Sequence, residues 1–213
     1  MKLFYFLTCS VIALMVLASC NPEPPANVVD VTAHDYYFDV SDSIPSGWTT
    51  FRLKNEGSCD HFFSLTLLPD NIKFERYGTD VGSAFAITWD SLRGGMDKAK
   101  AGVMLGSLLP QWYASAKYMG GTGIIEPGKT AQVTQKLLPG NYVMECYMKT
   151  KEGKFHNALG MVRPLTVLQK VSDMKEPNDA DVELTLSNYK IESKGKLTAG
   201  THRVAVHFKE QPK

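Results

Sequence analysis

The sequence predicts an all-β sandwich that is interrupted by a helical segment, and three observations support this fold class. Short apolar runs with a two-residue alternation recur along the chain and end at turn residues, as strands of a sandwich do. The pattern changes to helical spacing over about residues 71–120. The 213 residues, 44% of them hydrophobic and 21% charged, suit one or two globular domains.

Three strands are expected before the helical segment. Residues 29–33 alternate apolar and polar side chains, as a half-buried strand does. A proline and a glycine within residues 44–47 predict a turn, and the β-branched and aromatic residues of 48–53 predict a second strand. The apolar run 62–68 predicts the third strand.

The segment 71–120 is expected to form two or three short helices. Apolar residues recur near helical spacing over 72–81 and again over 96–109, and glycines and a proline separate these runs. Its large aromatic residues are expected to pack rather than to line a ligand pocket: Trp89, Trp112 and Tyr113.

Strand patterns return after the helical segment, at residues 124–126, 130–137, 141–147 and 161–168. In the third of these strands, Tyr142, Met144 and Cys146 share one face because side chains alternate with a period of two. Cys146 is therefore expected to point inward, and Glu145 to point the other way.

The chain also contains a partial internal repeat at a constant offset of 153 residues. The matched pairs are Thr32 with Thr185, Tyr36 with Tyr189, and Gly47 with Gly200. We therefore expect a main domain over 28–170, a linker over 171–180, and the first two strands of a second similar unit over 181–213. Two strands cannot bury a core by themselves.

The N-terminus resembles a bacterial lipoprotein leader. Lys2 precedes a short apolar run, and residues 17–20 (Leu-Ala-Ser-Cys) resemble the lipobox. We expect a signal peptide at 1–19, lipid on Cys20, and a proline-rich tether over 20–27. The protein would then be exported and anchored to a bacterial membrane, at its periplasmic face or at the cell surface. There are two alternatives: an ordinary signal peptide followed by a chance cysteine, or a short uncleaved anchor.

Charge and cysteine content narrow the function classes further. Without residues 1–19 the chain has equal numbers of basic and acidic side chains, so no nucleic-acid partner is expected. Cys59 and Cys146 are then the two cysteines beyond the lipid attachment site, in a compartment that permits disulfides. No hydrolase or phosphate-binding motif is present.

Four residues have side chains suited to a metal site: His61, Cys146, His156 and Met161. A type 1 (blue) copper site uses two imidazoles and a thiolate, with a weak thioether on the axis. Such a site takes one histidine from an early loop and the other three ligands from the loop that joins the last two strands.

The motifs around these residues resemble those of the cupredoxin family. Residues 55–61 are similar to its loop in which an asparagine precedes the first histidine ligand by six positions. Residues 138–142 are similar to its Pro-Gly-x-Tyr strand, which runs to the cysteine ligand, here Cys146. Residues 156–161 match its histidine-to-methionine spacing. The resemblance covers 28–168 apart from the helical segment, and implies a Greek-key sandwich with one type 1 copper.

The resemblance implies one-electron transfer with another envelope protein as redox partner, and a carrier rather than an enzyme. Nine residues separate Cys146 from His156, more than is usual in the family, so the polar stretch 149–154 would have to form a hairpin that returns to the site.

Two alternatives remain open. A disulfide between Cys59 and Cys146 would remove the thiolate and leave a metal-free binding module. A copper carrier or storage protein would instead bind Cu(I) without redox cycling.

Overall fold

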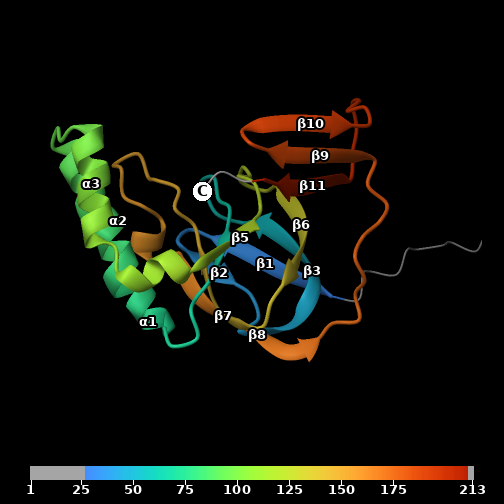
Figure 1. The fold of residues 1–213 in the computed structure, drawn as a ribbon, viewed down its shortest axis with the longest axis horizontal. Coiled ribbons are helices and arrows are strands. Elements are labelled where there is room, and N and C mark those ends of the chain that lie inside the picture. The colour runs from blue at the N-terminus through green and yellow to red at the C-terminus, as the bar shows by residue number, and fades with distance from the viewer. Residues whose placement is uncertain (1–26, 211–213) are drawn as a thin grey trace, which may run out of the picture.

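Two packed β-sheets form the main part of the protein, with a helical segment between β4 and β5 (Figure 1). The computed structural model describes residues 27–210, so the expected leader, Cys20 and residues 20–26 of the tether lie outside the described residues. The strands of the two packed sheets are β1 (Val28–His34), β2 (Tyr37–Asp39), β3 (Ser43–Asn55), β4 (Ser64–Leu67), β5 (Lys117–Gly121), β6 (Thr130–Leu137), β7 (Gly140–Glu145) and β8 (Val162–Val171).

Strand β3 belongs to both sheets. Its residues 47–54 pair with β6, while β1 lies on its other side. Its first residues, 43–46, pair in parallel with β8, which continues to β7, β4 and β5. The register shifts between Pro45 and Ser46, and Gly47 has a φ of 95°. The turn predicted at 44–47 is therefore wrong: a bulge tolerates the proline, and the strand bends there from one sheet to the other.

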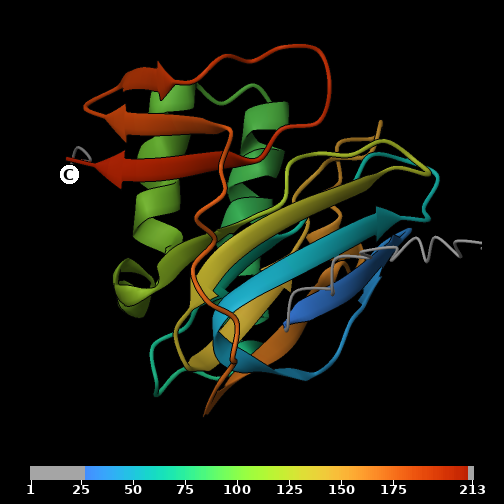
Figure 2. The same ribbon diagram turned by 90° about the vertical axis from the view of Figure 1, so that its right-hand side faces the viewer.

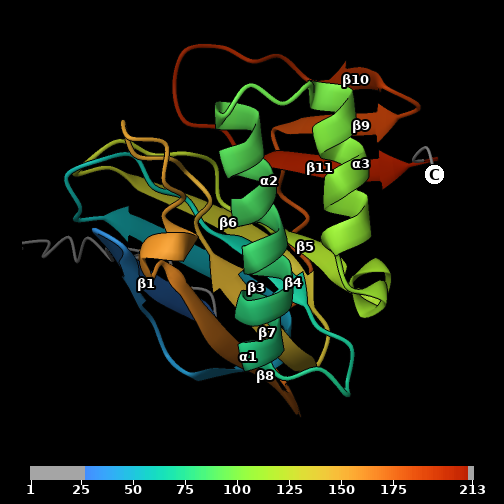
Figure 3. The same cartoon turned by 90° about the vertical axis from the view of Figure 1, so that its left-hand side faces the viewer.

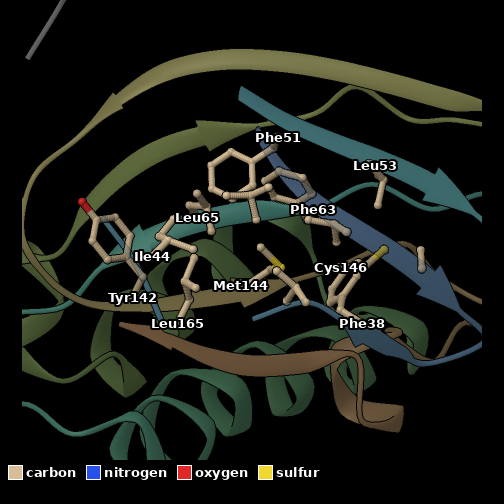
Figure 4. Packing of buried hydrophobic residues seen from close by; sticks show 14 of the residues in the cluster. Phe38, Ile44, Phe51, Leu53, Phe63, Leu65, Tyr142, Met144, Cys146 and Leu165 are labelled. Atoms are coloured by element: carbon tan, nitrogen blue, oxygen red, sulfur yellow. The ribbon is translucent and has the colours of Figure 1, made fainter. Parts of the chain in front are cut away.

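The core lies between the two sheets, as the alternating patterns predict. Three alternate residues of β1 are buried: Val29, Val31 and Ala33. The inward-facing residues at the two ends of the alternating pattern of β7, Tyr142 and Cys146, are buried as well. Figure 4 shows these last two side chains toward opposite ends of the apolar cluster. The core therefore continues up to Cys146, which lies just beyond the end of β7.

The predicted helical segment is present and covers the outer face of the β7 sheet (Figure 3). It contains α1 (Phe74–Arg76), the π-helical turn η1 (Tyr77–Gly82), α2 (Ser83–Arg93), α3 (Lys98–Leu108) and the 3-10 turn η2 (Gln111–Ser115). Val143 of β7 packs with Tyr77 and Val81, and Trp112 and Tyr113 pack against the same cluster. Glu145 points to this side, as predicted, and accepts a hydrogen bond from the Tyr77 hydroxyl.

The end of the helical segment differs from the prediction. Residues 117–121 form strand β5, which pairs with β4, so the segment does not extend to residue 120. Gly120 and Gly121 have φ values of 91° and 153°. A Cβ atom on Gly121 would lie 2.0 Å from the carbonyl oxygen of Phe63, so only glycine lets the chain pass this close to the neighbouring strand.

One further strand prediction is wrong. Residues 124–126 do not form a strand, and Ile125 makes only an isolated bridge with His61. The backbone N–H groups of these two residues each donate to the other's carbonyl oxygen, at 3.1 and 2.9 Å. This bridge fixes the backbone of His61 just before β4.

A separate three-stranded sheet repeats the pattern of β1, β2 and β3 (Figure 2). Its strand β9 (Val182–Ser187) pairs antiparallel with β10 (Lys190–Lys194) and parallel with β11 (Val204–Lys209). The registers recur at the offset of 153 residues: Thr32 faces Asp39 and Lys54, and Thr185 faces Glu192 and His207. The repeat has three strands rather than the predicted two, because the counterpart of β2 also pairs.

Within residues 27–210, the second sheet is only partly covered on the face that corresponds to the core, where Val182, the counterpart of Val29, is buried. Phe51 and Leu53 of β3 are fully buried, whereas their counterparts Val204 and Val206 are 42% and 47% exposed. Within residues 27–210, no helix is long and apolar enough to cross a membrane.

Candidate metal centre

The four predicted ligand residues are buried in one region of the sandwich. His61 lies just before β4, Cys146 follows β7, and Met161 directly precedes β8. His156 precedes the short 3-10 turn η3 (Asn157–Leu159). None of the four is more than 2% exposed. The structure thus brings an early loop and one late loop to the same place.

The long loop between Cys146 and His156 returns to the site through a hairpin. Lys149 and Phe155 form an antiparallel bridge, and the N–H of His156 donates to the carbonyl oxygen of Met148 at 2.8 Å. The hairpin predicted for 149–154 is therefore present, and it holds the His156 imidazole against Cys146. Nδ1 of His156 lies 3.7 Å from Sγ of Cys146.

The spacing between His156 and Met161 closes one tight turn. The N–H groups of Leu159 and Met161 both donate to the carbonyl oxygen of His156, at 3.0 and 2.9 Å. Gly160 adopts a left-handed φ of 117°, which favours glycine. Met161 is thereby placed beside Cys146, whose N–H donates to its carbonyl oxygen at 3.0 Å.

The buried Cys146 sulfur contacts backbone N–H groups in addition to the His156 ring. Burial raises the pKa of this thiol, whereas backbone hydrogen bonds from Phe62 and Met148 act to lower it. Backbone N–H groups that point at the sulfur favour a thiolate. A bound cation would add to this effect, because a coordinating thiol is deprotonated.

His61 has one ring nitrogen free for a metal. Its Nδ1 is buried without a hydrogen-bond partner, while its Nε2 lies 3.2 Å from Oδ1 of Asp35. A buried nitrogen left without a partner is costly, and a metal ion would satisfy it. Two imidazoles, a thiolate and a thioether form a donor set that suits copper. The residue types present therefore fit the copper site that the motifs imply, although the group with donor atoms within 4.8 Å of one another contains Cys59 rather than Cys146.

The loop before His61 explains the asparagine of the motif. The Asn55 side chain donates to the carbonyl oxygens of Cys59 and Ile125, at 2.8 and 2.9 Å, and accepts from the N–H of Gly57. Because Asn55 is buried at the end of β3, these bonds join the loop to the rigid sheet.

The sequence placed Cys59 near Cys146 as a possible disulfide partner, but did not predict its contacts with the two imidazoles. Its Sγ lies 3.7 Å from Nε2 of His61 and 4.0 Å from Nε2 of His156. These three residues form a cluster of possible metal ligands, with donor atoms all within 4.8 Å of one another. Burial and the Asp35 carboxylate raise the pKa of Cys59 to about 11, so this thiol is protonated at neutral pH.

Cys59 and Cys146 are both free in the structure. The disulfide alternative is therefore not the state that the structure contains. The two sulfurs contact different nitrogens of the same ring, since Cys146 lies against Nδ1 of His156 and Cys59 against its Nε2.

Sequence reasoning also missed the turn between β1 and β2. Asp35 contacts the His61 ring, and Tyr36 packs edge-on against His156 with ring centroids 5.0 Å apart. Hydrogen bonds from Ser58 and His61 lower the pKa of Asp35 to about 2. The available sequence signal was the match of Tyr36 to Tyr189, which marked the turn but not its contacts.

The cupredoxin motifs predicted two packed sheets, an early loop that ends at His61, and one late loop that contains the other three residues. The structure has all three features. The domain is cupredoxin-like in fold. Its helical segment packs on the outside of the sandwich.

No family model and no curated protein matches this chain. Among solved structures, the cupredoxin-like domain is similar to a dithionite-reduced auracyanin from Roseiflexus castenholzii, with 17% identity, a TM-score of 0.40, and coverage of 68% of this chain and 98% of the other. Auracyanin B is 22% identical, with a TM-score of 0.39, and the match covers 68% of this chain and 91% of the other. Auracyanin A, a blue copper protein from Chloroflexus aurantiacus, is 15% identical, with a TM-score of 0.39, and the match covers 66% of this chain and 97% of the other.

Proposed function

We propose that the protein binds one copper ion in a type 1 site and transfers single electrons. The observation that carries this proposal is the buried, unpartnered Nδ1 of His61. The His61 ring lies 5.0 Å from that of His156, centroid to centroid, and His156 in turn contacts the Cys146 sulfur. Copper in this site would supply one-electron chemistry between its two oxidation states.

Each residue has a distinct role in this proposal. Nδ1 of His61 and Nδ1 of His156 are the imidazole donors, Cys146 is the thiolate, and Met161 is the weak axial donor. Backbone N–H groups of Phe62 and Met148 stabilise the thiolate. Four protein donors leave no ligand position for a substrate, which favours electron transfer over catalysis.

The burial of the site supports the same role. The four side chains are at most 2% exposed, and both loops are fixed by backbone hydrogen bonds to one another or to β-strands. Since these ligands cannot move freely, the geometry changes little between oxidation states. A small change in geometry favours fast electron exchange.

We also propose that the protein acts at a membrane, where lipid on Cys20 would hold it near an envelope redox partner. The sequence Leu17-Ala18-Ser19-Cys20 supports this location. The short proline-rich tether that follows would keep the site near the membrane surface. Mass spectrometry of Cys20 in protein from cells tests the lipid; an unmodified thiol would contradict it.

The test of the copper site is a titration of purified protein with Cu(II), followed by visible absorbance and metal analysis. We expect an intense copper–thiolate band and one copper per chain. Cys146→Ser should abolish the band, whereas Cys59→Ser should keep it. Absence of the band from both the wild type and Cys59→Ser would contradict the proposal.

Cys59 favours a second candidate function, that of a Cu(I) carrier. A second sulfur beside both imidazoles offers another soft donor for Cu(I). Voltammetry separates the two functions: a reversible one-electron wave supports electron transfer, and tight Cu(I) binding without such a wave supports the carrier.

A further inference from the structure

The turn between β1 and β2 contacts both candidate histidine ligands, although it contains none of the four donors. We propose that Asp35 of this turn is a positioning residue of the copper site, which fixes the His61 ring so that Nδ1 faces the metal. This inference rests on the proposed copper site. It concerns how the ligand is held rather than which residues are ligands.

The hydrogen bond between Asp35 and His61 determines which ring nitrogen has the proton. Oδ1 of Asp35 lies 3.2 Å from Nε2 of His61. A carboxylate only accepts, so Nε2 must have the hydrogen. In the neutral ring, Nδ1 then has the free lone pair, and Nδ1 is the nitrogen that is buried without a partner. The pair thus prepares the ring for a metal before one is bound.

The Asp35 carboxylate is itself held by Ser58. The backbone N–H of Ser58 donates to Oδ1 at 2.9 Å, and its hydroxyl donates to Oδ2 at 2.5 Å. The thiol of Cys59 also approaches Oδ1, at 3.6 Å. A carboxylate with these partners cannot rotate away from the ring. Carboxylates that orient metal-bound histidines are held by further hydrogen bonds in the same way.

The backbone of the turn between β1 and β2 adopts a left-handed conformation at Tyr36. Tyr36 has a φ of 70°, which is uncommon for a bulky residue and marks a conformation that the surroundings must stabilise. In this conformation Tyr36 packs edge-on against His156, at an interplanar angle of 71°. One turn therefore places adjacent residues against the two imidazoles.

Gly57 provides the space that this contact needs. A Cβ atom at Gly57 would lie 2.5 Å from Oδ1 of Asp35 and 2.6 Å from Nε2 of His61. No larger residue fits between the loop and the pair without moving one of them.

The experiment compares Asp35→Ala and Asp35→Asn with wild type, using the chain from residue 20 with Cys20→Ala to prevent lipidation. Asparagine keeps an acceptor for the ring but loses the charge, while alanine loses both. The control is Asp60→Asn, which removes the same charge from the residue next to His61 but leaves the Asp35 contact in place. Circular dichroism checks that each variant folds.

The first measurement is the tautomer of His61 in metal-free protein, from long-range nitrogen–proton NMR. We expect Nε2–H in wild type, Asp35→Asn and Asp60→Asn, and a mixture of tautomers in Asp35→Ala. A single Nε2–H tautomer in Asp35→Ala, or Nδ1–H in wild type, would overturn the inference.

The second measurement is the copper dissociation constant, from competition with a chelator. Asp35→Ala should weaken binding about 10- to 100-fold, the usual loss when a partner of a ligating histidine is removed. Asp35→Asn should restore part of this loss. An equal loss in Asp60→Asn would show that charge alone acts, and would contradict the positioning role.

The two measurements separate this inference from the proposed function. If wild type shows the Nε2–H tautomer but binds no copper, the copper site is wrong and the Asp35 contact stands. If wild type binds copper and Asp35→Ala binds it equally well, the positioning role is wrong and the copper site stands.

Discussion

Nδ1 of His156 lies 3.7 Å from Sγ of Cys146, although nine residues separate the two in sequence. The intervening residues form a hairpin that leaves the site and returns to it, with Lys149 bridging Phe155. The two ends of this long loop therefore still meet at the candidate site. The backbone pairing at the base of the hairpin, where the N–H of His156 donates to the carbonyl oxygen of Met148, holds these two ends together.

Gly57→Ala should weaken copper binding. The added Cβ would lie 2.6 Å from Nε2 of His61, so either the ring or the loop must move. Gly106→Ala, in α3, is the matched control because a Cβ there meets nothing within 4 Å. It should raise stability by about 0.5–1 kcal/mol through helix propensity. Copper titration and chemical unfolding check both variants; unchanged copper affinity in Gly57→Ala would contradict the close contact.

The two free cysteines should differ in reactivity. Cys59 is partly exposed and Cys146 is buried, so an alkylating reagent should modify Cys59 first in folded, reduced, metal-free protein. The raised pKa of Cys59 means that its labelling should accelerate as the pH increases toward 11. Mass spectrometry of peptides after labelling gives the order. Protein from cells with a Cys59–Cys146 bridge would support the disulfide alternative instead.

Equivalent positions in the two repeats should respond differently to the same kind of substitution. Phe51→Ala removes a fully buried ring and should cost about 3–5 kcal/mol of unfolding free energy. Its counterpart Val204 is 42% exposed, so Val204→Ala should change stability within about 0.5 kcal/mol. Urea unfolding measures both. A large loss for Val204→Ala would show that the face of β11 is covered in solution.

The hydrogen bond between Tyr77 and Glu145 should link the helical segment to the sandwich. Glu145 is buried, and its partners are the Tyr77 hydroxyl and the Asn157 side chain. Tyr77→Phe leaves the carboxyl group with one of these donors and should cost about 1–3 kcal/mol. Tyr189→Phe is the control, since that ring is 92% exposed. Thermal unfolding of the two variants should differ; equal values would mean that water replaces the lost hydroxyl.

Asp80 should make the helical segment sensitive to acid. Hydrogen bonds from Arg76, Thr79 and Trp112 lower the pKa of its carboxyl group below the ordinary value of 3.8. A carboxyl group whose pKa is lower in the folded state stabilises the fold above the unfolded pKa. That contribution is lost as the pH falls through the lowered value. Asp80→Asn should therefore reduce stability at pH 7 and show a smaller further loss below pH 4, as measured by urea unfolding across pH.

The alternation of apolar residues was sufficient to predict most strands and the inward direction of Cys146. Two-residue periodicity depends only on whether neighbouring positions face the core, and so it can be read locally. The same reasoning failed at residues 44–47 and 117–121. There the path of the chain depends on a strand bending between sheets and on a close approach to Phe63, and neither is a local property.

The sequence by itself determined the four candidate ligands and their order, because motifs of residue type and spacing are local. It also determined the repeat, whose registers recur in the second sheet at the same offset. Only the tertiary structure placed Asp35 against His61 and Cys59 beside both imidazoles. Asp35 is 26 residues from His61, and Cys59 is 97 from His156. These contacts exist because the pairing of β1 with β3 brings a turn and a loop to the same edge, a relationship that spacing along the chain does not contain.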